Sequence, residues 1–264
     1  MTAALLQIEA LTLRYGGLTA IDSLDLTLEA GSLDALIGPN GAGKTSFFNL
    51  VTGLNKQQAG TIRLDGARID SLSPDRRARR GLARTFQNLR LFTQMTALEN
   101  VLTGMHLHVA ESLFEILTRL GQFRSQERAA LREAKELLSF VGLAAAAHRP
   151  AGALSYGDQR RLEIARALAS TPKLLLLDEP AAGMNPAETA ALKDLLLQIK
   201  GRGVSMLLVE HDMSLVMQLC DKITVLNFGR KIAEGAPAAV RADSAVIEAY
   251  LGVKGAGELR GAGT

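Results

Sequence analysis

Residues 38–46 read GPNGAGKTS, and this short stretch decides how the rest of the chain is interpreted. It matches the pattern G-x-x-x-x-G-K-[ST] at Gly38, Gly43, Lys44 and Thr45. An apolar run precedes it and TSFFNLVTGL follows, which is the strand–loop–helix setting that a phosphate-binding loop requires. Glycines turn successive backbone N–H groups inward, and a helix N-terminus adds positive potential toward phosphate. The stretch therefore predicts a phosphate-binding loop.

Two side chains of this loop carry specific expectations. Lys44 is expected to neutralise the β and γ phosphates of a nucleotide, and Thr45 to offer a hydroxyl to Mg²⁺. A glycine-rich turn between a strand and a helix would not explain a lysine and a threonine at these two places. The predicted nucleotide contacts are Gly38, Pro39, Asn40, Gly41, Ala42, Gly43, Lys44, Thr45 and Ser46.

The composition is that of a globular protein, with 264 residues of which 47% are apolar and 22% are charged. A net charge of +3 is too small to indicate nucleic-acid binding, and the densest basic run, DRRARR at 75–80, is interpreted as a solvated helix face. Cys220 is the only cysteine, so no disulfide framework or thiolate metal cluster is predicted. Neither a signal peptide nor an apolar run of about 18 residues is present, which predicts a cytosolic protein.

Periodicity predicts a small, mostly antiparallel sheet near the start of the chain, from strands at 5–14, 20–28 and 60–66. From about 88 to 158 the chain is predicted to be helical, because SLFEILTRL and SQERAALREAKELLSFVGL repeat apolar residues every three or four positions. ITVLNFGRKIAEG, at 223–235, predicts a hairpin.

Two later segments, KLLLLDEP and VSMLLVEHD, are continuous apolar runs that end in polar residues. Such runs are typical of parallel strands buried on both faces. After the first run, Asp178 is suited to hold Mg²⁺ through water, and Glu179 to accept a proton from an attacking water. His211 ends the second run, which would lie beside the first, where it could hydrogen-bond a γ-phosphate.

A second anion site is predicted at residues 154–168, LSYGDQRRLEIARAL, where Ser155 and Gly157 begin a helix. One chain does not need two such sites for one triphosphate. In order along residues 5–251, these motifs resemble the nucleotide-binding subunit of an ABC transporter.

The resemblance implies the fold class: α/β, a P-loop NTPase core with an antiparallel β subdomain and an inserted α-helical subdomain. It implies a single ATPase domain over residues 1–251, with the core and β subdomain in 1–87 and 159–251 and the helical subdomain in 88–158. Residues 252–264 are expected to form a flexible tail.

The resemblance also implies roles for site residues, with ATP and Mg²⁺ as ligands. Tyr15 would stack on adenine, and Gln87 would sense Mg²⁺ or the attacking water. The remaining implied roles are catalysis by Glu179, His211 and Gln87, metal contact by Thr45, Gln87 and Asp178, and contact with ATP on a facing subunit by Ser155, Gly157 and Asp158.

Longer sequence stretches, including RTFQNLRLFTQMTALENV and DEPAAGMNPAET, resemble those of one of the two ATPases of bacterial branched-chain amino acid importers, the one with the longer helical insert. The implied partners are a second ATPase subunit, identical or different, in a head-to-tail dimer, and two membrane-spanning permease subunits. A periplasmic or extracellular amino acid-binding protein would act indirectly, and no nucleic acid is expected. The implied location is peripheral, on the cytoplasmic face of the inner (plasma) membrane.

Other assignments stay open. ATPases of urea or other amide importers are related, and ABC ATPases that act on nucleic acid or the ribosome usually carry two units or a long coiled insert. A P-loop kinase would lack LSYGDQ and the EHD strand end.

Three features depart from a simple pattern. Asp34 stands in the strand before the phosphate loop, where it is expected to face the antiparallel sheet or to be solvated, and Asn185 stands where many ABC proteins have an aspartate. Residues 88–101 crowd apolar side chains, and these are predicted to divide between the core of the helical subdomain and a groove for helices of membrane partners. They are Leu89, Leu91, Phe92 and Met95.

Overall fold

The structure, a computed structural model, describes residues 4–105 and 120–250. Most of the helix predicted from SLFEILTRL and the predicted tail lie outside the described residues. The strands of the described part are β1 (Ala4–Tyr15), β2 (Leu18–Glu29), β3 (Leu33–Ile37), β4 (Ala59–Leu64), β5 (Ala67–Arg68), β6 (Leu82–Arg84), β7 (Leu174–Asp178), β8 (Ser205–Val209), β9 (Lys222–Asn227) and β10 (Arg230–Gly235).

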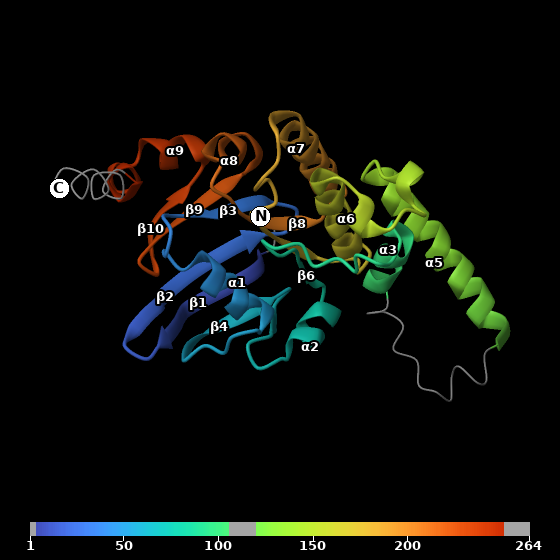
Figure 1. Cartoon of the computed structure of the whole chain (residues 1–264). Helices are drawn as coiled ribbons and strands as arrows, with labels where there is room; N and C mark the ends of the chain where they lie inside the picture. The colour runs from blue at the N-terminus through green and yellow to red at the C-terminus, as the bar shows by residue number, and fades with distance from the viewer. Residues whose placement is uncertain (1–3, 106–119, 251–264) are drawn as a thin grey trace.

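The described helices are distributed around two sheets (Figure 1). They are α1 (Lys44–Thr52), α2 (Pro74–Arg79), α3 (Ala97–Met105), α5 (Leu120–Phe140), α6 (Tyr156–Leu168), α7 (Pro186–Gly201), α8 (Met213–Leu219) and α9 (Pro237–Ala242), with 3-10 turns at Ala144–Ala146 and Ala151–Ala153. Helices α3, α5 and α6 gather at one side of the molecule, at the right in Figure 1.

Both predicted sheets are confirmed. The antiparallel sheet has the order β2-β1-β4-β5, and the larger sheet has the order β10-β9-β3-β8-β7-β6. In the larger sheet β6, β7, β8, β3 and β9 are parallel, and β9 and β10 form the predicted antiparallel hairpin. Strands buried on both faces therefore occur where the continuous apolar runs predicted them.

Two apolar cores lie on opposite faces of the larger sheet. Because successive strand side chains point to opposite faces, Leu175 and Leu177 join one core while Leu174 and Leu176 join the other. The first core packs under α3 and α5 to α8, and the second contains α1 and the inner face of the antiparallel sheet. Strands β3, β7 and β8 thus have no solvated face along their length.

The expectation of helix from about residue 88 is wrong for residues 88–96, which form a loop. Its backbone bonds a distant segment: the N–H groups of Ala151 and Gly152 donate to the carbonyls of Met95 and Thr93. The helix begins only at Ala97, behind a cap in which Thr96 exchanges hydrogen bonds with Glu99. The T-x-x-E spacing at 96–99 is a start signal that could have located this boundary.

The interpretation of residues 75–80 as a solvated face is wrong for Arg77, which is only 2% exposed. Its guanidinium donates to the backbone carbonyls of Leu50 and Val51 at 2.6 and 2.9 Å. These carbonyls lie in the last turn of α1, where helical partners run out, and Leu50 also accepts from the capping Gly53 N–H at 3.1 Å. The buried cation supplies a further donor to both. Arg77 therefore joins α2 to the end of α1.

Asp34 is buried, with 5% exposure, on the face of the larger sheet that packs against the antiparallel sheet, which is the first of the two predicted alternatives. Burial raises the pKa of its carboxyl to about 6, against the lowering effects of Lys222 and a Ser32 hydrogen bond. The Lys222 ammonium is 3.8 Å away and has Glu234 as a closer partner at 3.1 Å. Asp34 Oδ1 has no hydrogen-bond partner.

Asp34→Asn is expected to stabilise the protein above pH 6. A carboxyl with a higher pKa in the folded state makes folding less favourable as pH rises from about 3.8 to about 6, and the loss persists above that. Asparagine removes this ionisation, for a gain of about 1 to 3 kcal/mol in unfolding free energy. Urea unfolding of variant and wild type at pH 4.5 and 7.5 measures the gain, which should shrink at the lower pH.

The matched control for this test is Asp194→Asn on the exposed face of α7, which should change stability by less than about 0.5 kcal/mol at both pH values. A gain for Asp34→Asn that is equal at both pH values would contradict ionisation as its cause.

Candidate functional site

The predicted phosphate loop and the predicted catalytic residues Glu179 and His211 come together at the carboxyl edge of the larger sheet. Strands β3, β8 and β7 are neighbours and run parallel, so their ends meet at one edge. The phosphate loop follows β3, Asp178 and Glu179 stand at the end of β7, and His211 follows β8. The prediction that the second apolar strand lies beside the first is confirmed.

The loop at 38–46 turns directly into helix α1, as its motif predicted. Gly43 has φ of 107°, and a Cβ there would lie 2.5 Å from the Ala20 carbonyl oxygen, so only glycine fits. Lys44 Nζ donates to the carbonyls of Gly38 and Pro39 at 2.6 and 3.0 Å. The Lys44 ammonium is thus held over the loop that is predicted to bind phosphate.

The electrostatics of Lys44 link this loop to the acidic residues. Burial lowers the pKa of its ammonium, and the negative charges of Glu179 and Asp178 oppose that shift. Both carboxylates therefore act on the lysine, although they lie more than 130 residues away in sequence. Lys44 and these two acids are therefore assembled beside the loop.

Glu179 contacts both of the other residues predicted to be catalytic, Gln87 and His211. Gln87 Nε2 donates to its Oε2 at 2.9 Å, and His211 Nε2 lies 2.7 Å from its Oε1. Its backbone has φ of 48°, a strained conformation for a residue other than glycine, and its N–H donates to the Val209 carbonyl at 2.8 Å. The carboxylate is held from both sides at a strand end.

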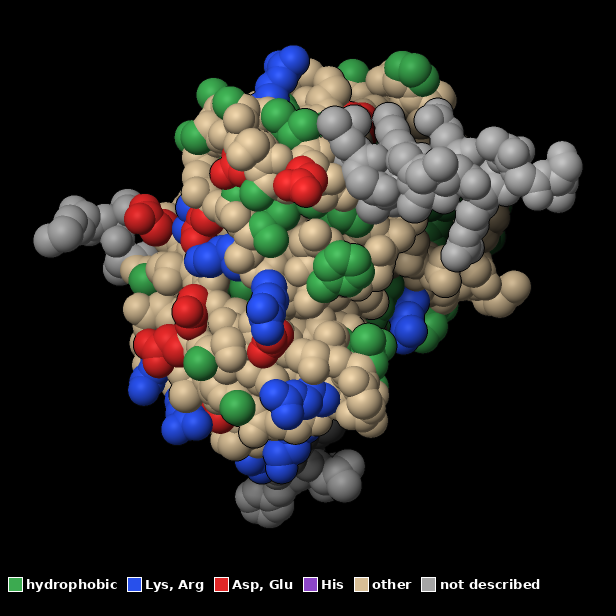
Figure 2. Space-filling view, turned by 90° about the vertical axis from the view of Figure 1, so that its left-hand side faces the viewer, with side chains coloured by type: hydrophobic (Ala, Val, Ile, Leu, Met, Phe, Trp, Pro, Cys, Tyr) green, Lys and Arg blue, Asp and Glu red, His purple; other side chains and the backbone are tan. Residues whose placement is uncertain are grey.

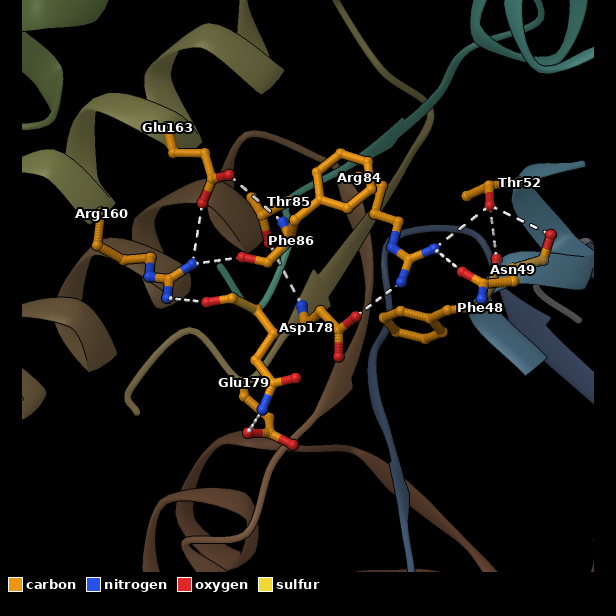
Figure 3. A network of polar contacts seen from close by, with 11 residues as sticks. Phe48, Asn49, Thr52, Arg84, Thr85, Phe86, Arg160, Glu163, Asp178 and Glu179 are labelled. Carbon is orange, nitrogen blue, oxygen red and sulfur yellow. Dashed lines mark hydrogen bonds and ion pairs between the residues drawn. The ribbon is translucent and has the colours of Figure 1, made fainter. Parts of the chain in front are cut away.

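Asp178 has a partner that the sequence reasoning missed. Arg84 Nη2 donates to Asp178 Oδ2 at 2.7 Å, and the same guanidinium bonds Asn49 of α1 at 2.7 Å (Figure 3). Both members of the pair are buried, with side-chain exposures of 6% and 5%. The sequence signal that could have identified this partner is an arginine in a short strand three residues before Gln87.

The three residues predicted to contact Mg²⁺ supply donors of a suitable kind. The hydroxyl of Thr45, the amide oxygen of Gln87 and the carboxylate of Asp178 are hard oxygen donors, which Mg²⁺ prefers. This ion is usually bound by one or two carboxylates together with phosphate and water, and Asp178 is the carboxylate here. Arg84 holds one oxygen of Asp178, which leaves Oδ1 for such a contact. Among the described residues no cluster of three or more His, Cys, Asp or Glu is arranged around a metal position.

Glu210 is a second residue that the sequence reasoning missed. Its buried carboxylate accepts hydrogen bonds from the N–H groups of Ala181 and His211 at 2.7 and 3.0 Å, and burial raises its pKa. One side chain thus orders the turn after Glu179 and the backbone of His211.

The segment predicted as a second anion site begins helix α6. The Ser155 side chain caps it by accepting from the Asp158 N–H at 3.2 Å. A Cβ on Gly157 would lie 2.7 Å from the Glu188 carboxylate, so a larger residue here would displace the Glu188 side chain. Asn185, the cap of α7, joins these residues around a hollow of about 240 Å³.

Not every predicted contact residue is brought to Glu179. In the described part of the chain no hydrogen bond or ion pair joins Ser155, Gly157 or Asp158 to it. Tyr15 lies at the end of β1, is 49% exposed, and accepts a hydrogen bond from the Asn55 side chain.

The surface carries side chains of mixed character. On the face in Figure 2, Lys and Arg side chains alternate with Asp and Glu, and apolar side chains occur in small groups. Among the described helices, none is both long enough and apolar enough to span a bilayer.

Comparison with known proteins agrees with this architecture. A family described as ABC transporter matches residues 21–182, and one described as branched-chain amino acid ATP-binding cassette transporter matches residues 230–256. The high-affinity branched-chain amino acid transport ATP-binding protein BraF of Pseudomonas aeruginosa is 46% identical, over 96% of this chain and 99% of the relative. Its counterpart LivG of Escherichia coli K12 is 44% identical, with the same coverage.

More distant matches show the breadth of the family. The lipopolysaccharide export system ATP-binding protein LptB of Haemophilus influenzae is 33% identical, over 94% of this chain and 98% of the relative. Among solved structures, a nucleotide-free ATP-binding cassette from an ABC transporter superposes with a TM-score of 0.82 at 30% identity, covering 94% of this chain and 99% of that one. By its motifs, its fold and these matches, the chain belongs to the ABC transporter family of ATP-binding proteins.

Proposed function

We propose that this chain is the ATP-hydrolysing subunit of an ABC importer for branched-chain amino acids. The observation that supports hydrolysis is the convergence of Gln87 and His211 on Glu179, beside Lys44. The cargo rests on the BraF and LivG relatives and on the match at 230–256, since cargo is selected by other subunits. The LptB relative shows that membership of the family alone does not determine cargo.

The proposed chemistry assigns one task to each residue. Backbone N–H groups of the loop and Lys44 bind the β and γ phosphates of ATP, and Tyr15 stacks on adenine. Mg²⁺, held by Thr45, Asp178 and Gln87, would neutralise charge that develops on the phosphates. Because an ionised carboxylate only accepts hydrogen bonds, His211 donates from Nε2 to Glu179, which leaves Glu179 to take the proton of the attacking water.

Closure of two subunits is proposed to complete the site. Ser155, Gly157 and Asp158 lie on the N-terminus of α6, where helix dipole and cap favour an anion, yet no described contact joins them to Glu179. A head-to-tail dimer with an identical or different ATPase would place them against ATP on the facing subunit. The 13-residue α6 runs without a break across the proposed subdomain boundary at 158/159.

Docking to two membrane-spanning permease subunits is proposed at a groove of about 430 Å³ beside Gln87. Its lining combines apolar side chains with the charged residues Arg84, Glu163 and Arg166, and Phe92, which also lines it, is 54% exposed. Leu91 packs against the core instead, so the predicted division of this segment between core and surface is supported. Such docking would hold the chain peripherally at the cytoplasmic membrane face, with a substrate-binding protein on the far side.

Glu179→Gln is expected to block hydrolysis while preserving ATP binding. Glutamine can keep hydrogen bonds to Gln87 and His211 but cannot accept a proton, so turnover should fall by at least about 100-fold. Phosphate release assays and ATP-binding titrations measure the two properties, and a nucleotide-trapped dimer should accumulate on gel filtration. Near-normal turnover would assign the base elsewhere.

Ser155→Arg is expected to prevent dimer closure but not ATP binding by the monomer, because Lys44 and Tyr15 are untouched. The control is Ser155→Ala, which loses the same helix cap, at a cost of about 1 kcal/mol, without adding bulk or charge. ATP-dependent dimerisation of both variants in the Glu179→Gln background is measured by light scattering. An Arg variant that dimerises like the Ala variant would refute the proposed sandwich.

Phe92→Glu is expected to leave the isolated protein folded and hydrolysing ATP, while abolishing its recruitment to membranes and amino acid uptake. Leu197→Glu, on an exposed position of α7 outside the groove, is the control. ATPase rate in solution and co-sedimentation with the permease subunits are measured together. Unfolding would make Phe92 a core residue, and retained binding with retained uptake would move the docking surface elsewhere.

A further inference from the structure

A buried ion pair lies on helix α6, just behind the residues that begin it. Arg160 Nη1 donates to Glu163 Oε2 at 2.9 Å, and the side chains are 0% and 1% exposed (Figure 3). Neither residue belongs to the chemistry proposed above. The presence of this pair needs an explanation beyond stability, because the desolvation of two buried charged groups can cost as much free energy as their attraction returns.

The pair is directed at the backbone that carries Gln87. Arg160 donates to the Phe86 carbonyl at 2.7 Å and to the Gln87 carbonyl at 2.9 Å. Glu163 Oε1 accepts from the N–H groups of Phe86 and Arg90, both at 3.4 Å. Donors and acceptors of the loop are therefore held together from one helix, as Figure 3 shows for Phe86.

These backbone contacts matter because Gln87 lies in a segment without regular secondary structure. Gln87 is exposed and lies in the irregular segment 85–96 that follows β6. Its side chain reaches Glu179 at 2.9 Å, so a small shift of its backbone would break that contact. The tyrosine hydroxyl of Tyr156, which accepts from Arg160 at 2.9 Å, fixes the guanidinium in turn.

We propose that Arg160, supported by Glu163, is a positioning residue that fixes Gln87 against Glu179 and ties this contact to the helix that begins at Ser155. The inference rests on the function proposed above for Gln87. Its consequence is mechanical: α6 and the Gln87 backbone move as one body. Displacement of the helix end that faces a partner's ATP is thereby transmitted to the chain's own catalytic carboxylate.

The test is a double-mutant cycle in the intact protein. Arg160→Lys keeps the charge but cannot donate in a fork to two carbonyls and a carboxylate. It should lower kcat about tenfold or more, with a smaller effect on KM for ATP, since misplacement by about 1 Å can cost that much. In a Gln87→Ala background the same change should lower kcat by less than about twofold, because its target is already absent.

Two measurements separate positioning from general stability. Arg77→Lys is the matched control, since Arg77 is equally buried and bonds backbone carbonyls away from the site. Both variants should lower the melting temperature, but Arg77→Lys should leave kcat of the folded protein within about twofold. Hydrogen exchange of the peptide spanning 82–92 should be faster in Arg160→Lys and unchanged in Arg77→Lys.

Each alternative outcome is decisive. Equal losses of kcat in the wild-type and Gln87→Ala backgrounds, or unchanged exchange at 82–92, would overturn the positioning role. A wild type without ATPase activity would instead refute the proposed function. If Gln87→Ala alone retains full kcat, Arg160 has no catalytic target and the inference fails while hydrolysis stands. Should Arg160→Lys not fold, Glu163→Gln, which leaves Arg160 without its counter-ion, enters the same cycle and must show the same non-additivity.

Discussion

The parallel strands β3, β7 and β8 are covered on both faces, and this constraint decides where polar chemistry can lie. Residues 174–177 alternate between two apolar cores, so a charge inside the strand would have no water on either side. Asp34, inside β3, shows the cost, since burial raises the pKa of its carboxyl to about 6, whereas a polar group at a strand end is not enclosed between the two cores. The phosphate loop therefore shares one edge of the sheet with Asp178, Glu179 and His211. They lie close together because the strands that precede them are adjacent and parallel.

Buried arginines join the elements that this sheet leaves separate. Arg77 ends α1 and anchors α2, Arg84 joins β6 to β7 and α1, and Arg160 joins α6 to the backbone after β6. Each guanidinium offsets its desolvation by donating to carbonyl or carboxylate oxygens with fixed positions. These contacts are directional, unlike apolar packing, so they set the relative placement of elements around the site. The compensation is incomplete, because Arg84 Nε and Arg160 Nε are buried without a hydrogen-bond partner, as is Asp34 Oδ1.

Prediction from the sequence succeeded where a local rule has one outcome. The glycine–lysine motif at 38–46, the alternating strands of the antiparallel sheet and the apolar run ending in Asp178 all stand where they were expected. It was wrong where backbone partners are distant: residues 88–96 bond residues near 150 instead of forming a helix. The prediction from sequence was also wrong for Arg77. Its charge predicts exposure, and the local sequence does not reveal that the guanidinium donates to a carbonyl at the end of α1.

The sequence by itself determined the order of the elements, the family, and the identity of the residues at the carboxyl edge of the sheet. It could do so because strand periodicity, turn chemistry and motif spacing act over a few residues. Only the tertiary structure decided that Gln87 and His211 both reach Glu179, that Arg84 pairs with Asp178, and that Arg160 grips the Gln87 backbone. Those contacts join residues that are tens of positions apart, and their geometry follows from how sheets and helices pack, which no local pattern encodes.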